Sequence, residues 1–359
     1  MGTSLTLLSM NKLYPAFVFV LISLVSNSFV VRAQTTTLRF AKLITGQGDV
    51  IVDPVVVIEG NKIIRVSTGE KNIPVNTTLV DLRPLTAIPG LIDVHTHITY
   101  FWDRAPGTNP WASRLDPATT VFLAQENALK TLETGVTTVR DLGSSGGTDL
   151  SMRDLINRGA MKGPRMVVAG NGLHISRGRL SPGVTTVDAS RADGVDEVIK
   201  VTRQELGAGV DWIKMYGSTG SAQNVTGFQT FTQEEMKAAV DVARQAGKRV
   251  AIHSYGPEGC KAAVWAGAAS VEHATDVDKE TFAEMVKRGT FYVPTVDHNR
   301  YYVDHRDEYG YNMFIVKALN SYIERNFKSL QLAVKMNVKI AMGSDAVFTG
   351  FGENTRELN

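Results

Sequence analysis

From residue 88 onward one pattern recurs along the chain: a short apolar run follows a glycine or lysine and ends in a polar residue. Between the runs lie segments with apolar residues at helical spacing, such as 232–246 and 278–288. Strands that alternate with helices in this way are typical of parallel sheets, because parallel strands need crossover connections. The eight runs are AIPGLIDVHTH, ETGVTTVRD, GPRMVVAG, GAGVDWIKMYG, GKRVAIHSYG, GAASVEHATD, GTFYVPTVD and NVKIAMGSDA.

Eight strand–helix units predict an α/β fold of the TIM (β/α)8 barrel type over residues 88–359. An open doubly wound sheet is the alternative, but it would leave no reason for polar residues at so many strand ends. The carboxyl ends of barrel strands instead form one face, on which sites are built. After the eighth run the chain reaches VFTGFGENTRELN, where a last helix should begin. We therefore expect the last helix and any C-terminal strands to be truncated.

The segment before the predicted barrel has a different composition and pattern of residues. Residues 34–87 are rich in Val, Ile and Thr, with turn signals at GQGD, EGNK and NIPVN. Such runs predict short antiparallel strands. With 359 residues the chain is long enough for one large domain and a small appendage. We expect a small β-sandwich region at 34–87, followed by the barrel.

The first 33 residues predict a secretory signal peptide. Lys12 precedes the apolar stretch 14–25, and small or apolar residues lead to Ala33. This core is shorter than the roughly 20 residues that a membrane span needs. We expect cleavage near Ala33 and an exported, periplasmic or secreted protein; an uncleaved anchor is the alternative. Met10, directly before the basic residue and the apolar core, is a second candidate for the true start besides Met1.

Charge and cysteine content limit the classes of partner. The formal net charge is +2, with 38 basic and 36 acidic residues spread along the chain. This balance does not favour nucleic acid or an acidic membrane surface, and a small-molecule substrate fits better. A homo-oligomer is possible, and no stable membrane insertion is expected. The only cysteine is Cys260, which predicts a small buried residue and excludes an internal disulfide.

Histidines and acids gather at the strand ends. In a strand, alternate side chains share a face, so His95 and His97 point the same way. Imidazole and carboxylate groups are preferred ligands of Zn²⁺ and similar ions. The sequence therefore predicts a metal site at one mouth of the barrel. Its candidate ligands are His95, His97, Lys214, His253, His273 and Asp345.

Lys214 does not fit such a site in its ordinary form. An ammonium beside metal cations is repelled, and its burial is costly. The side chain must therefore be modified or point away from the metals.

These motifs together resemble the amidohydrolase superfamily, from the small β region through IPGLIDVHTH to GSDA. The resemblance implies two divalent metal ions, expected to be Zn²⁺, and an N6-carboxylated Lys214 that binds both. By the same resemblance His95, His97 and Asp345 hold the more buried ion, and His253 and His273 hold the second. A hydroxide would bridge the two ions, and Asp345 would carry the nucleophile's proton to the leaving amine.

The phrases IPGLIDVHTH, GVTTVRDLG, GVDWIKMYG and HSYG are most similar to the imidazolonepropionase-like branch, which contains Xaa-Pro and Xaa-Arg dipeptidases. This implies a dipeptidase or an N-acyl amino acid hydrolase. A cyclic amide hydrolase or a deaminase on the same fold is an alternative. Deamination is disfavoured because no glutamate lies three residues after His253, and because Lys214 is present. A truncated, non-catalytic barrel is the third possibility.

Four further predictions concern single side chains. A dipeptide carries a free carboxylate, and Tyr255 and His174 are our candidates to bind it. Each has an alternative role, since Tyr255 can simply pack and His174 can simply order its loop. Arg140 and Asp141 are expected to form a structural pair at a strand end. His298 and His305 are expected at the surface or in a lid, where one of them could contact substrate; these two residues stand in the stretch DHNRYYVDHRDEYGY.

Overall fold

The computed structural model describes residues 35–102, 104, 115–176, 190–218 and 227–359. The predicted signal peptide, residues 1–33, lies outside the described residues. The chain divides between Pro89 and Gly90 into two compact units, each of which is described by itself.

The small unit is a β-sandwich of two sheets, as predicted. One sheet has the strand order β5-β4-β1-β6 and the other β3-β2-β7. The pair β4 and β1 runs antiparallel, and Val55, Val56 and Val57 of β4, whose side chains alternate between the two faces, are all buried. The strands are β1 (Thr35–Arg39), β2 (Lys42–Ile44), β3 (Val50–Val52), β4 (Pro54–Glu59), β5 (Lys62–Thr68), β6 (Thr78–Asp81) and β7 (Thr86–Ala87), with a 3-10 turn η1 (Glu70–Asn72).

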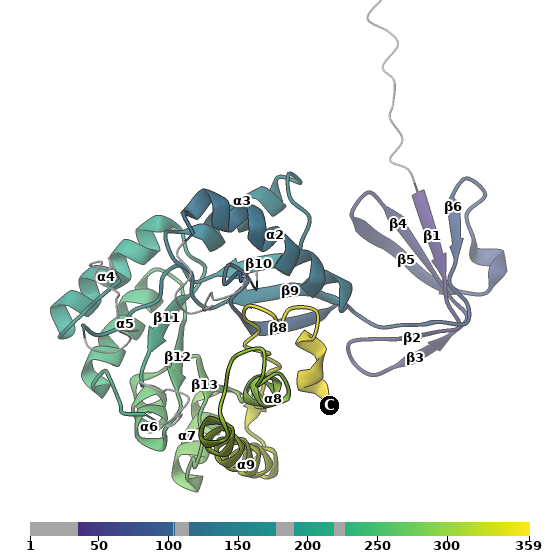
Figure 1. Cartoon of the computed structure of the whole chain (residues 1–359). Helices are drawn as coiled ribbons and strands as arrows, with labels where there is room; N and C mark the ends of the chain where they lie inside the picture. The colour runs from purple at the N-terminus through teal and green to yellow at the C-terminus, as the bar shows by residue number, and fades with distance from the viewer. Residues whose placement is uncertain (1–34, 103, 105–114, 177–189, 219–226) are drawn as a thin grey trace, which may run out of the picture. The chain divides into compact units, whose positions relative to one another are not determined.

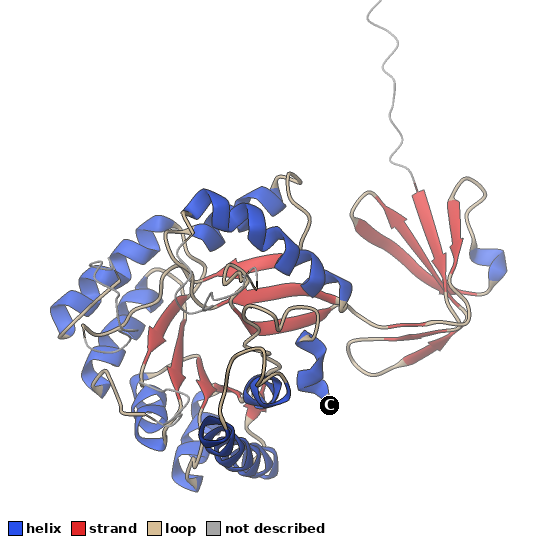
Figure 2. Ribbon diagram, in the orientation of Figure 1, coloured by secondary structure: helices blue, strands red, loops and turns tan. Residues whose placement is uncertain are grey.

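The large unit is a barrel of parallel strands, which confirms the predicted fold (Figure 2). All eight predicted runs form strands, in the sheet orders β10-β9-β8 and β11-β12-β13-β14-β15. Parallel bridges from Leu173 to Met215 and from Thr96 to Ala346 join these sheets and close the barrel. The strands are β8 (Leu91–Thr96), β9 (Val136–Asp141), β10 (Arg165–Val168), β11 (Ile213–Tyr216), β12 (Val250–Ser254), β13 (Ser270–His273), β14 (Phe291–Val293) and β15 (Lys339–Ile340).

Helices surround the barrel strands and cover their outer faces (Figure 1). All but one of them follow a strand along the chain, as crossovers between parallel strands require, and the exception, Met313–Lys335, follows another helix. A short 3-10 turn, η3 (Asn354–Leu358), follows β15. The helices are α2 (Pro117–Glu133), α3 (Thr148–Asn157), α4 (Val195–Ala208), α5 (Gln233–Gln245), α6 (Pro257–Ala266), α7 (Lys279–Arg288), α8 (Val296–Asp304) and α9 (Met313–Lys335).

The two helices predicted from spacing form where the sequence places them. In α5 a capping box closes the first turn, since the side chains of Thr232 and Glu235 each accept from the other residue's backbone amide. In α7 Asp278 caps the first turn and Gly289 ends the helix with a φ of 73°. Glycine adopts this left-handed conformation without steric cost, so the chain can turn directly into β14.

The barrel core is built from the apolar strand runs and the inner helix faces. Ile213, Met215 and Ile252 are fully buried, and Cys260 is buried in α6 as predicted. None of the helices within the described ranges has the length and apolar character needed to cross a membrane.

Candidate metal centre

All six candidate ligands meet at the carboxyl ends of the barrel strands. His95 belongs to β8, Lys214 to β11, and His253 to β12, while His273 is the last residue of β13. The ring centroids of His95 and His97 are 5.4 Å apart, and those of His253 and His273 are 4.6 Å apart. All of the six are buried except His253, which is half-buried. His97 directly follows β8, and Nε2 of both His95 and His97 lies within 3.4 Å of Oδ1 of Asp345, which is the shared direction that strand alternation predicts.

The densest part of this cluster joins His95, His273 and Asp345. One ligand atom from each lies within 4.8 Å of the other two. Oδ1 of Asp345 is 3.4 Å from Nε2 of His95 and 3.3 Å from Nε2 of His97. Two atoms bound to one tetrahedral ion with bonds of about 2.1 Å lie roughly 3.4 Å apart. The donor atoms of these side chains are therefore spaced as they would be around a single shared cation.

Hydrogen bonds fix the orientation of two of the rings. Nδ1 of His95 lies 2.9 Å from Oε2 of Glu272, and Nδ1 of His97 lies 3.0 Å from the carbonyl oxygen of Gly143. An acceptor at Nδ1 places the ring proton there and leaves the Nε2 lone pair available to a metal. Both histidines thus present Nε2 toward Asp345.

The third ring is oriented by the residue that precedes α8. Nδ1 of His273 lies 2.7 Å from the hydroxyl oxygen of Thr295. That hydroxyl makes no capping bond to its own helix, because it is used on the histidine. The role of Thr295 is therefore at the candidate centre rather than at the helix end.

Burial sets the protonation of these side chains. It lowers the pKa of His95 to about 4, and it also lowers the pKa values of His97, His253 and His273. Burial alone would raise the pKa of Asp345, but the nearby imidazoles of His298 and His95 outweigh it and hold this pKa well below its usual range. Neutral imidazole and ionised carboxylate are the metal-binding forms of these groups.

Lys214 is buried beside the other candidate ligands, as its position at the end of a predicted strand led us to expect. Its Nζ lies 3.4 Å from Nε2 of His95 and 5.2 Å from the centroid of the Tyr216 ring. The ammonium thus approaches the lone pair that His95 would offer to a metal. An unmodified lysine and a cation would compete for this atom.

The two predicted substrate contacts lie near the candidate centre in different ways. The Tyr255 ring stacks on His273 with a centroid distance of 5.0 Å and meets His253 edge-on at 4.7 Å. His174 is one ring further away: it lies 6.5 Å from Tyr216, whose ring is 5.6 Å from His253. Tyr255 therefore contacts two of the candidate ligands directly, and the Tyr216 ring links His174 to His253.

Glu272 is a site residue that sequence reasoning missed. It is fully buried and bonds His95 on one side and NH2 of Arg140 on the other, at 3.0 Å. Burial would raise the pKa of Glu272, but the Arg140 guanidinium and the bond from His95 lower it to about 2. A glutamate in an otherwise apolar strand run, ASVEHA, was the available signal.

The prediction that Arg140 and Asp141 form a structural pair is wrong. Arg140 points toward Glu272, whereas Oδ1 of Asp141 accepts from the hydroxyl of Thr96 and the amide of Ile98. Adjacent residues of a strand project to opposite faces, so the two side chains cannot meet.

Of the two positions expected for His298, the surface or a lid, the surface placement is wrong, because the residue lies beside the candidate centre. Its side chain is 10% exposed, and Nε2 lies 3.3 Å from Oδ2 of Asp345. His305, at the end of the same helix, stacks on Tyr301 instead. Helix α8 thus brings His298 to the candidate general base.

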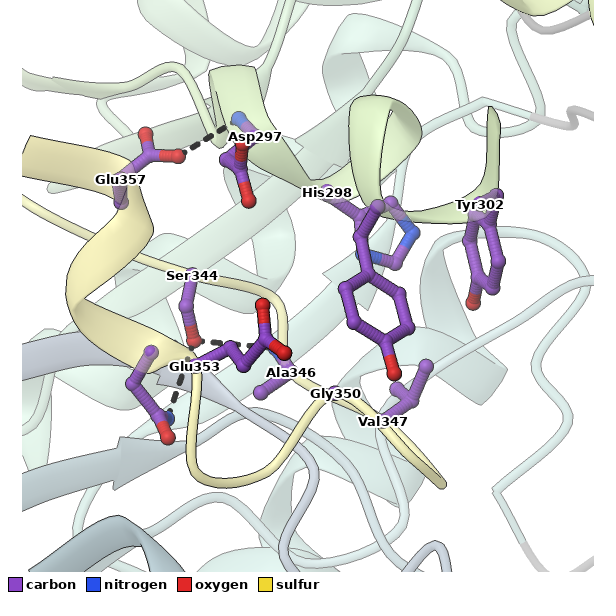
Figure 3. A pocket seen from close by; sticks show the side chains of 11 residues that line it. Asp297, His298, Tyr302, Ser344, Ala346, Val347, Gly350, Glu353 and Glu357 are labelled. Carbon is purple, nitrogen blue, oxygen red and sulfur yellow. Dashed lines mark hydrogen bonds between the residues drawn. The ribbon is translucent and has the colours of Figure 1, made fainter. Parts of the chain in front are cut away.

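A small pocket beside the centre shows how α8 is held (Figure 3). The carboxylate of Glu357, in η3, accepts hydrogen bonds from the amides of Val296 and Asp297 at 2.9 and 2.8 Å. Amides in a first helical turn lack intrahelical partners, and an acid there is favourable. Glu357 therefore supplies the cap that the Thr295 side chain does not give.

Three of these residues adopt a left-handed backbone. The φ values are 73° at His273, 48° at Thr295 and 51° at Asp345. Residues other than glycine rarely adopt this conformation, and each instance costs of order 1–3 kcal/mol. Such strain concentrates at functional sites, where the surrounding structure holds it in place.

Known proteins resemble this chain in sequence and in structure. The model of the amidohydrolase family matches residues 86–358. Ochratoxinase from Aspergillus niger is 28% identical over 342 residues, covering 87% of this chain and 69% of that protein. A crystal structure of a Xaa-Pro dipeptidase with bound methionine in the active site is similar, with a TM-score of 0.81 and 31% identity over 90% of this chain and 82% of that one.

A prolidase complexed with N-methylphosphonate-L-proline is also similar. Its TM-score is 0.76 at 26% identity, and the match covers 88% of this chain and 79% of that one. These structural neighbours confirm the resemblance to the imidazolonepropionase-like branch. A barrel with a buried His–His–Asp cluster, matched over most of its length by one family model, leads to one conclusion: the chain belongs to the amidohydrolase family.

Proposed function

We propose that this protein is an exported, binuclear metal-dependent hydrolase that cleaves amide bonds of dipeptides, of the Xaa-Pro or Xaa-Arg type, or of N-acyl amino acids. The observation that carries the proposal is the buried cluster of His95, His273 and Asp345, whose ligand atoms lie within 4.8 Å of one another. Export rests on the sequence of residues 1–33 alone.

Two ions of the Zn²⁺ type are proposed, because imidazole and carboxylate are ligands that Zn²⁺ prefers. In the proposed arrangement His95, His97 and Asp345 hold one ion, and His253 and His273 hold the other. Carboxylation of Lys214 would turn the ammonium that lies 3.4 Å from His95 into an anionic ligand for both. The competition between lysine and cation would then disappear. When bound, divalent ions lower the pKa of coordinated water and polarise the substrate carbonyl.

The protein's own residues then move the proton and orient the amide. Asp345 is buried and ionised, so it can accept a proton from the attacking water and deliver it to the leaving amine. His298, at 3.3 Å from its Oδ2, holds that carboxylate in place. Tyr255 and His174 remain our candidates to bind the free carboxylate of the substrate, with Tyr255 the nearer to the candidate ligands.

The choice of dipeptides rests on the similar structures. One of these is a Xaa-Pro dipeptidase, and another is a prolidase complexed with a proline derivative.

The test is the metal content of the purified protein, by elemental analysis, with a Lys214→Ala variant. We expect about two divalent ions per chain, falling to one or none in the variant. Lys261→Ala is the matched control, because Lys261 is exposed on α6 and bonds only Glu280 and Asp278 among the described residues. A single ion that Lys214→Ala does not affect would contradict the bridging role.

Substrate class is tested separately with the metal-loaded protein. A panel should include Xaa-Pro and Xaa-Arg dipeptides, N-acyl amino acids, a cyclic amide and an aminated heterocycle. Turnover of the first three kinds, lost in Asp345→Asn, is the expected result. Turnover restricted to the cyclic amide or the heterocycle would replace the dipeptidase proposal with the alternative chemistry.

A further inference from the structure

The barrel has a second cavity, at the mouth opposite the candidate metal centre. Its volume is about 720 Å³. It is lined by Trp212, Arg249, Phe291 and Lys339, each of which precedes or begins its strand. The candidate ligands instead stand at the strands' carboxyl ends, so parallel strands separate the two sites by the length of the barrel. We call this cavity the floor cavity.

The floor cavity is cationic. Among the described residues that line it, four are basic and none is acidic. Two of these charges are neutralised, because Arg140 pairs with Glu272 at 3.0 Å and Arg288 pairs with Glu284 at 2.6 Å. Arg249 and Lys339 form no ion pair within the described part of the chain. The floor cavity therefore holds two positive charges without a protein counter-ion.

Aromatic rings lie beside both of these charges. The guanidinium of Arg249 is 6.0 Å from the centroid of the Trp212 ring, and Arg140 approaches the same ring at 4.4 Å. The ammonium of Lys339 is 5.6 Å from the centroid of Phe291. Such contacts are attractive but do not neutralise a cation. Arg249 and Lys339 are therefore held beside aromatic rings and keep a positive charge that an incoming anion can pair with.

The remaining wall is apolar and reaches solvent. Ile92 is 57% exposed and Phe291 is 39% exposed, and Val94 and Val167 line the interior. Cavities of about 300–1,000 Å³ with apolar walls and a few convergent polar groups are typical of small-molecule sites. The lining thus combines an apolar surface with two cations, Arg249 and Lys339, that have no ion-pair partner among the described residues.

From this combination we propose that the floor cavity binds a small aromatic carboxylate. Its ring packs between Trp212 and Phe291, and its carboxylate lies between Arg249 and Lys339. The proposal concerns the opposite end of the barrel from the candidate metal centre, and it holds or fails independently of the proposed hydrolase activity.

Calorimetric titration of the metal-loaded protein with 2-naphthoate tests this site. We expect one equivalent of 2-naphthoate to bind. The neutral isostere 2-naphthamide should bind at least roughly tenfold more weakly, since it lacks the charge. Arg249→Met and Lys339→Met should each weaken 2-naphthoate binding by roughly tenfold. Both side chains are exposed, so neither change disturbs the core.

Matched controls separate the floor cavity from other positions. Arg244→Met and Lys335→Met remove exposed charges outside the cavity and should leave the affinity unchanged. His97→Ala, at the opposite mouth, should also leave it unchanged. Trp212→Phe keeps an aromatic surface and should weaken binding less than Arg249→Met does. The proposal would be overturned by an absence of binding at millimolar 2-naphthoate, by wild-type affinity in both Arg249→Met and Lys339→Met, or by loss of binding in His97→Ala.

Discussion

The hydroxyl oxygen of Thr295 lies 2.7 Å from Nδ1 of His273. This contact makes the residue before α8 a support for a candidate metal ligand. Partners of this kind set the orientation and basicity of the ring that they contact, and their loss typically weakens metal binding 10- to 100-fold.

Replacing Thr295 by Val should therefore lower metal affinity by about 10- to 100-fold while keeping the shape of the side chain. Competition with a chelator of known affinity measures this change. Thr295→Ser retains the hydroxyl and should restore most of the affinity. Thr275→Val is the control, because that buried hydroxyl bonds the carbonyl of Tyr255 instead. Equal metal affinity in Thr295→Val and wild type would remove this role.

Glu357→Ala should destabilise the protein through the start of α8. The substitution removes two bonds to the amides of Val296 and Asp297, and the loss of a helix cap costs about 1–2 kcal/mol. Because α8 also carries His298, turnover should fall as well. Urea unfolding gives the free energy, and Glu353→Ala is the control, since that exposed side chain pairs only with Arg356 among the described residues. A free energy unchanged in Glu357→Ala would show that α8 needs no cap.

Acid should destabilise the metal-free protein. The usual pKa of histidine is 6.5, and burial lowers the pKa of His95 to about 4. As the pH falls from 6.5 toward 4, the imidazole of His95 binds a proton in the unfolded chain but stays neutral in the folded chain. This difference lowers the stability of the folded state across the window. Urea unfolding between pH 7 and pH 4.5, after EDTA treatment, measures the effect.

The same protonation should release metal in that pH window, because only neutral imidazole binds it. His305→Gln is the control for the acid effect, since His305 lies outside the candidate centre, and its pH profile should match wild type. A fall in stability between pH 6.5 and 4.5 that is just as large in His95→Gln as in wild type would contradict the burial of a neutral imidazole at this position.

Cys260 should resist thiol reagents in the folded protein. It is fully buried, and burial raises the pKa of its thiol to about 12, so almost no reactive thiolate is present at neutral pH. Because it is the only cysteine of the chain, labelling by iodoacetamide reports on this position alone. We expect full labelling in urea and almost none without it. Native-state labelling at the rate of a free thiol would mean that α6 opens readily.

The sequence predicted the parts of the site that follow from regular strand geometry. Side-chain alternation in β8 gave His95 and His97 a common direction, and parallel strands brought Lys214, His253 and His273 to the same end. These inferences need only the period of a strand and the direction of its neighbours. The small sandwich and the helices around the barrel follow from similarly local patterns.

What the sequence did not predict depends on contacts between distant segments. His298 reaches Asp345 because η3 caps α8, through a bond between Glu357 and Val296 across 61 residues. Glu272 adjoins His273 in β13, and strict alternation would send their side chains to opposite faces. The φ of 73° at His273 breaks this alternation, so both side chains serve the centre. Neither effect has a local sequence pattern.

The closure of the barrel has a consequence for the order of events during biosynthesis. The amide of Asp345 donates to the carbonyl of His95 at 2.7 Å, and the amide of Ser344 donates to Asp93 across 251 residues. A nascent chain must therefore carry Ser344 and Asp345 out of the ribosome before the donor atoms around His95 can come together. Contacts of such long range form late in folding. Metal uptake at the proposed centre would thus come only after the segment with Ser344 and Asp345 has been synthesised and has paired with the strand that carries His95.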